Sequence, residues 1–76
     1  SKTINLYTVE SNIAKNLGQI QKKYKNSVDI GSYPFFRLGK IGVAIVTRSS
    51  SLTKLKSVNK ELIKLIKLKK ILMLKV

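Results

Sequence analysis

The side chains with the clearest capacity for recognition lie together in the middle of the chain. Tyr33, Phe35 and Phe36 fall within four successive positions that include Pro34, and Arg37 follows directly. Aromatic rings beside a cation can stack on nucleic-acid bases or anchor a protein interface, and they also fill the cores of small sheets. Because successive strand residues face opposite sides, Phe35 and Phe36 cannot share one core. Tyr33, Phe35 and Phe36 are therefore candidate protein-contact residues, with core packing and base stacking as alternatives.

Catalytic and metal-binding side chains are scarce. The sequence has no histidine and no cysteine, which removes the commonest general base and the commonest ligands of transition metals. The three acids, Glu10, Asp29 and Glu61, fall in different segments, whereas a carboxylate pair or a hard-cation site needs them close together. We therefore expect no catalytic residue, no metal site and no cofactor in this chain, and no enzymatic activity of its own. The lack of cysteine also favours the cytoplasm.

The chain is strongly basic, with sixteen Lys and Arg against three Asp and Glu and a net charge of +13. This charge favours nucleic acid as a partner, but only Arg37 and Arg48 are arginine, the residue best suited to bidentate phosphate contacts. A solvated lysine-rich face is the competing interpretation. The candidate nucleic-acid contacts are Arg37, Lys56, Lys60, Lys64 and Lys67. No uncharged run approaches the roughly 20 apolar residues of a membrane span, so we expect no membrane partner.

Strands must position the aromatic segment. Residues 28–36 and 40–48 are rich in aromatic and β-branched side chains and are separated by a glycine-containing loop, which predicts an antiparallel hairpin. Pro34 lacks a backbone donor, so its strand belongs at an edge or a bulge. Residues 43–46 are continuously apolar, which predicts a central strand. Residues 3–9 alternate less cleanly and suit a further strand.

Two helical periods complete the pattern. Residues 13–24 place apolar side chains at steps of four, three and four, behind the capping residues of segment 10–12. A second helix follows the serines at 49–51, any of which is a competent N-cap, and its apolar phase fails near 67–70. Its expected buried stripe is Leu52, Leu55, Val58, Leu62, Leu65 and Ile66.

The order of elements predicts an α+β fold. We expect a two-layer β-α-β-β-α sandwich with a small three-stranded mixed sheet and two helices on one face. If the first two strands were adjacent and parallel, their crossover would be right-handed. Residues 1–70 form this single module, and residues 71–76 are an apolar tail that we expect to add a strand or to serve as a contact segment.

Several motifs resemble one known family. They are Val9-Glu10-Ser11-Asn12-Ile13-Ala14, Asp29-Ile30-Gly31-Ser32-Tyr33-Pro34-Phe35-Phe36, Gly39-Lys40-Ile41-Gly42 and Val46-Thr47-Arg48-Ser49. The chain is similar over residues 2–68 to the KH-like C-terminal module that follows the molybdopterin-binding-like domain in CinA-family competence/damage-inducible proteins, and to a related segment of FAD synthases. The resemblance implies that this is a domain fragment of a longer protein. It also implies a nucleotide- or pterin-binding α/β domain upstream, whose pyrophosphatase or molybdenum-cofactor-related activity has no catalytic counterpart here.

A GxxG string at residues 39–42 invites a nucleic-acid function, since KH domains use such a loop to clamp a nucleic-acid backbone. In KH domains that loop joins two helices, whereas here it falls between two expected strands. Glycine in that position serves a hairpin turn by adopting positive φ. We therefore interpret the string as a turn.

The function expected from the sequence is that of an accessory module. It would pack against the upstream nucleotide- or pterin-binding domain or a second protomer, through the aromatic strand and the apolar tail. The alternative is a weak nucleic-acid-binding KH-like module that uses its basic face.

Overall fold

The computed structural model describes residues 1–74 and has the expected α+β composition. Its elements in chain order are β1 (Lys2–Tyr7), the 3-10 turn η1 (Glu10–Asn12), α1 (Ala14–Tyr24), β2 (Asp29–Arg37), β3 (Lys40–Arg48), α2 (Leu52–Leu68) and β4 (Leu72–Met73).

The sheet differs from the expected one. It has four strands in the order β2-β3-β1-β4, and every neighbouring pair is antiparallel, so the expectation of a three-stranded mixed sheet was wrong. β1 does not lie beside β2, because β3 lies between them as the predicted central strand. The fourth strand comes from the apolar tail, where Leu72 pairs with Tyr7 and Met73 with Leu6. Residues 75–76 of that tail lie outside the described residues.

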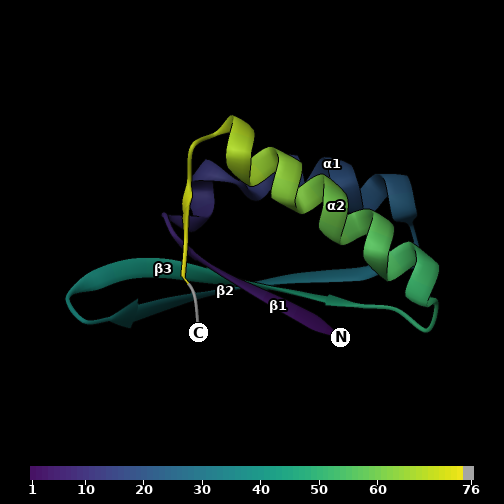
Figure 1. The fold of residues 1–76 in the computed structure, drawn as a ribbon, viewed down its shortest axis with the longest axis horizontal. Helices are drawn as coiled ribbons and strands as arrows, with labels where there is room; N and C mark the ends of the chain where they lie inside the picture. Colours follow the sequence, from purple (N-terminus) through teal and green to yellow (C-terminus); the bar gives the residue numbers. More distant parts are fainter. Residues whose placement is uncertain (75–76) are drawn as a thin grey trace.

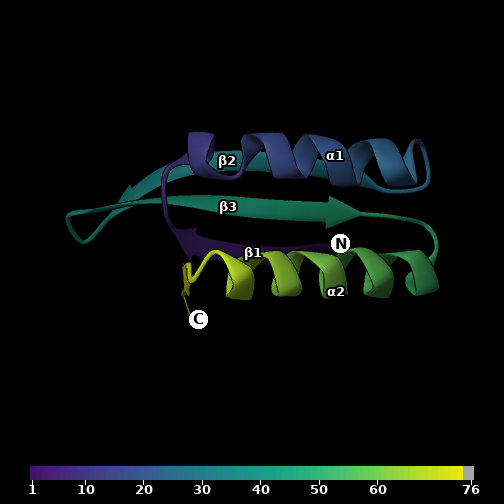
Figure 2. The same cartoon turned by 90° about the horizontal axis from the view of Figure 1, so that it is seen from above.

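Both helices cover the same face of the sheet, which makes two layers (Figure 1). Seen from above, α1 lies over β2 and α2 lies on the other side of β3, over β1 (Figure 2). The opposite sheet face carries no helix, and the β2–β3 hairpin extends beyond the helical layer at one end (Figure 1).

The core lies between the two layers, where the inward-facing side chains of the strands pack against the apolar sides of the helices. The register pairs Ile4 with Ile45 and Leu6 with Val43, so these side chains face the helices together. The buried hydrophobic residues are Leu6, Ile13, Leu17, Val28, Val43, Ile45, Leu55, Val58, Leu62 and Ile66. Leu52 was placed wrongly in the buried stripe of α2, since it is the first residue of the helix and is 73% exposed.

The helix ends follow local chemistry. Among the three serines it is Ser51 that caps α2, since its hydroxyl accepts a hydrogen bond from the Lys54 amide at 3.3 Å. The helix ends at Leu68, within the expected range. Segment 10–12 does not cap α1 as expected but forms η1, and Ile13 occupies the N-cap position without a side-chain bond.

The outer edge of β2 is partly covered by one side chain of the same molecule, that of Gln21. In a hairpin with a two-residue turn, alternate residues of β2 bond to β3 and the others point outward. The outward amide of Ile30 donates to Gln21 Oε1 at 2.8 Å, and Gln21 Nε2 donates to the Val28 carbonyl at 2.7 Å. Pro34, the next but one outward residue, has no amide to offer. Pro34 therefore lies on an edge strand as predicted, and Gln21 covers the part of that edge at Val28 and Ile30.

Candidate interaction surfaces

The sheet face without helices, here called the open face, carries most of the aromatic cluster. By register it presents Tyr7 of β1, Tyr33 and Phe35 of β2, and Ala44 and Val46 of β3. Phe35 is half-buried and Tyr33 is 52% exposed. Neither belongs to the buried core, so the alternative of core packing fails for both.

Rings on the open face are packed against the sheet rather than free. Phe35 lies on Gly42, where an added Cβ would stand 2.3 Å from the ring. The Arg37 guanidinium lies 5.4 Å from the centre of the Phe35 ring on the same face, and the Lys40 amine lies 5.0 Å from that of Tyr7. Gly42 is therefore a packing residue inside β3 and not part of the turn, which corrects half of the turn interpretation.

Three exposed apolar side chains form a second surface, here called the hairpin tip. It consists of Phe36, Leu38 and Ile41, which are 72%, 87% and 56% exposed. Phe36 pairs with Ile41 across the strands, and Leu38 and Gly39 form the two-residue turn with φ of +53° and +75°. The sequence pointed to Phe36 but not to Leu38 or Ile41. The available signal was a leucine immediately before a turn glycine.

The basic residues named from the sequence do not form one patch. Lys56, Lys60, Lys64 and Lys67 are all exposed on α2, as the helical period predicts. Arg37 lies on the opposite side of the sheet, against Phe35. The structure therefore separates the candidate arginine from the candidate lysines.

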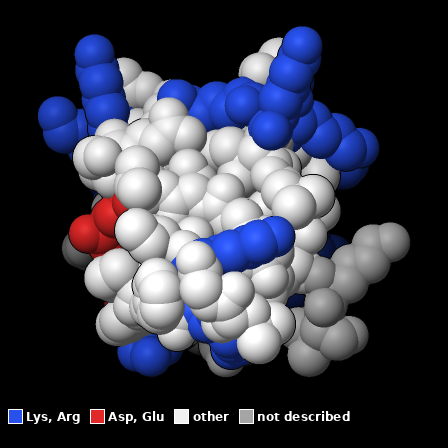
Figure 3. Space-filling view, turned by 90° about the vertical axis from the view of Figure 1, so that its left-hand side faces the viewer, with Lys and Arg blue, Asp and Glu red and all other residues white. Residues whose placement is uncertain are grey.

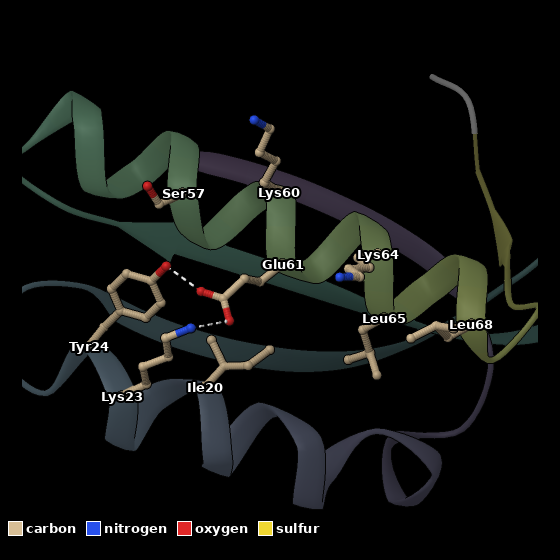
Figure 4. A pocket seen from close by; sticks show the side chains of 9 residues that line it. All are labelled: Ile20, Lys23, Tyr24, Ser57, Lys60, Glu61, Lys64, Leu65 and Leu68. Atoms are coloured by element: carbon tan, nitrogen blue, oxygen red, sulfur yellow. Dashed lines mark hydrogen bonds and ion pairs between the residues drawn. The ribbon is translucent and has the colours of Figure 1, made fainter.

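A groove of about 610 Å³ runs between α1 and α2, and sequence reasoning missed it. Glu61 of α2 reaches across to α1, where it accepts hydrogen bonds from the Tyr24 hydroxyl and, at 3.1 Å, from Lys23 Nζ (Figure 4). Lys60 points away from this trio (Figure 4). The groove is lined by Ile20, Lys23, Tyr24, Ser57, Lys60, Glu61, Lys64, Leu65 and Leu68.

The trio shifts the titration of both acidic groups. The hydrogen bond from Tyr24, helped by that from Lys23, holds the pKa of Glu61 below its ordinary value. The same bond to Glu61, together with burial, raises the pKa of Tyr24 to about 12. Lys23–Glu61 is the only ion pair within residues 1–74. Glu61 therefore links the two helices, an arrangement here called the interhelical clamp, and both of its carboxylate oxygens are already hydrogen-bonded.

Within the described part of the chain no group of three or more Asp, Glu, His or Cys residues could hold a metal ion. None of its helices has the length and apolar character needed to span a membrane.

One comparison with known proteins identifies the chain. The family model described as "FAD synthase, middle domain" matches residues 1–75. Comparisons with curated proteins and with solved structures gave no match, so the KH-like shape stays a prediction. The family match covers the open face, the hairpin tip and the interhelical groove alike.

Proposed function

The chain belongs to the family of FAD synthase middle domains, and on this premise we propose that it is a non-catalytic packing module of a longer, cytoplasmic protein. Its role would be to hold a neighbouring nucleotide- or pterin-binding α/β domain, as the resemblance to the CinA family also implies. The observation that carries the proposal is the open face.

An uncovered sheet face with aromatic side chains favours burial against another protein surface. The middle of the open face is made of small or apolar residues, Gly42, Ala44 and Val46, flanked by the rings of Tyr33 and Phe35. Aromatic side chains are enriched in interfaces, and a stable interface buries about 800 Å² on each partner. That area is roughly one seventh of the 5421 Å² of accessible surface described here, which a single sheet face can supply.

Thiol labelling in the parent protein tests the proposal, because this chain has no cysteine of its own. Val46→Cys places a thiol on the open face, and Lys56→Cys places one on the exposed side of α2. We expect alkylation of the first thiol to be at least about tenfold slower in the parent protein than in the isolated chain, as burial excludes the reagent. The second thiol should react alike in both. Equal rates at Val46→Cys would refute the packing role, and protection that appears only with rising concentration of the isolated chain would show a second copy instead.

The alternative function, weak nucleic-acid binding, would use the α2 lysines, whose common exposure is the observation in its favour. Arg37 would not contribute, and the rings of Tyr7 and Phe35 are already covered by cations. A titration with single-stranded RNA at 50 and 200 mM salt distinguishes the two functions, because phosphate contacts weaken steeply with salt. Binding that falls with salt and is lost in a variant with Lys60→Gln and Lys64→Gln would support the alternative.

A further inference from the structure

The hairpin tip extends beyond the part of the sheet that the helices cover. The helical layer reaches its limit over β2 at Ser32, whose hydroxyl donates to Glu10 Oε2 at 2.8 Å. Pro34 and Phe36 follow on the same face by the period of two, with Ile41 opposite Phe36. By register these side chains face the same way as the core residues, yet they remain exposed, because the hairpin extends beyond the helical layer (Figure 1).

Leu38 occupies a position that both backbone and solvent disfavour. Positive φ at both turn residues defines the type I′ hairpin turn, whose first position normally carries Asn, Asp or Gly. Leucine is bulky and rarely adopts this conformation, and its side chain is 87% exposed. With this exposure, burial within the described residues does not offset the cost of the backbone conformation. Local rules broken in this way point to a functional contact outside the chain.

The two cations beside the turn lie away from the apolar side of the hairpin tip. Arg37 and Lys40, the cations beside the turn, fold onto the rings of Phe35 and Tyr7 on the open face, away from Phe36 and Ile41. The view onto this end of the molecule shows uncharged surface above a cationic side chain that crosses its middle, with further cations along the upper rim and the lower edge (Figure 3). An apolar contact framed by cations fits a protein pocket with an acidic rim.

We propose that Phe36, Leu38 and Ile41 insert into an apolar pocket with an acidic rim on the neighbouring domain of the parent protein. The inference rests on the proposed function for the existence of that domain, and it names a different surface from the open face. A second copy is a poor occupant because each chain carries +13. The groove between α1 and α2 of a second copy is also a poor pocket for the hairpin tip, because Lys23 and Lys64 line it and would repel the cations there.

Leu38→Asn tests the proposal with opposite effects in two settings. In the isolated chain asparagine suits the turn, so we expect Tm to rise by about 4 °C. In the parent protein we expect amide hydrogen exchange of residues 36–41 to become at least about tenfold faster, since the anchor is lost. Leu52→Asn, the same change at an exposed leucine outside the hairpin tip, should leave that exchange unchanged.

Three results would overturn the proposal. The first is exchange of residues 36–41 that is equal in the isolated chain and the parent protein, or unaffected there by Leu38→Asn. The second is dimerisation of the isolated chain that Leu38→Asn abolishes. The third is Leu38-dependent binding to vesicles of phosphatidylserine and phosphatidylcholine. If the thiol of Val46→Cys is nevertheless protected in the parent protein, the packing role stands and only the insertion of the hairpin tip fails.

Discussion

The hydroxyl of Tyr24 and the carboxylate of Glu61 join the two helices at a single point, and their titration makes the link measurable. We expect Tyr24→Phe to lower the free energy of unfolding at pH 7 by about 1 kcal/mol, the net value of one partly exposed hydrogen bond. Because the folded pKa of Glu61 is lowered, its contribution is complete above the ordinary value of 4.5 and is lost as pH falls through the folded value. Because that of Tyr24 is raised, its contribution is complete below pH 10 and is lost towards about 12.

Urea unfolding followed by circular dichroism between pH 2.5 and 12 measures this difference. Tyr33→Phe is the matched control, since within residues 1–74 the Tyr33 hydroxyl makes no hydrogen bond. The clamp would be disproved if Tyr24→Phe cost as much at both extremes of pH as at neutrality.

Two glycines in different elements respond oppositely to the same substitution. In β3 an alanine Cβ at Gly42 would meet the Phe35 ring at 2.3 Å and the Leu6 carbonyl oxygen at 2.8 Å. We expect Gly42→Ala to destabilise the fold by about 1–3 kcal/mol, the usual cost of overpacking. In α1 a Cβ at Gly18 meets nothing within 4 Å, and we expect Gly18→Ala to stabilise the fold by about 0.5–1 kcal/mol.

Thermal unfolding of the two variants and the unchanged chain measures both effects, since we expect Tm to fall for Gly42→Ala and to rise for Gly18→Ala. A stabilising Gly42→Ala would mean that Phe35 moves aside at little cost, and the packed open face described above would then be incorrect.

At the level of elements, local periodicity and turn chemistry predicted much of the fold, whereas strand partners were beyond them. The apolar run at 43–46 identified the central strand, and Pro34 identified an edge strand. Both signals are local in the sequence, because they depend on residue type and not on which strands pair. The partner of β1 depends on how Ile4 and Leu6 meet Ile45 and Val43 across the core, and the same alternation would suit another neighbour. β4 has only two residues and no period to detect.

The candidate surfaces divide in the same way. Phe35 and Phe36 could be named as candidate contact residues because successive strand residues cannot both face one core. The Tyr24–Glu61 clamp joins residues 37 positions apart, so no spacing rule reaches it. The exposure of Ile41 follows from where the helical layer stops, which is a tertiary property.

At the scale of the whole molecule the dominant quantity is charge. With +13 and a single ion pair within residues 1–74, the folded state repels itself more than a balanced protein does. We expect Tm to rise as NaCl increases from 10 to 150 mM, because the Debye length falls from about 30 to about 8 Å over this range.

Calorimetry in sucrose of equal osmolality at 10 mM salt separates screening from solute exclusion. A Tm that stays constant or falls as NaCl increases would show that repulsion between the lysines does not destabilise the fold.

The partly covered edge of β2 also bears on how folded copies of this molecule meet at high concentration. A fibril grows only if each added chain offers one free row of amides and carbonyls and accepts another. With Gln21 bonded to one end of the β2 edge and Pro34 interrupting it, this edge is a poor place for a further strand to add. Edge-to-edge pairing of folded chains through β2 is therefore disfavoured.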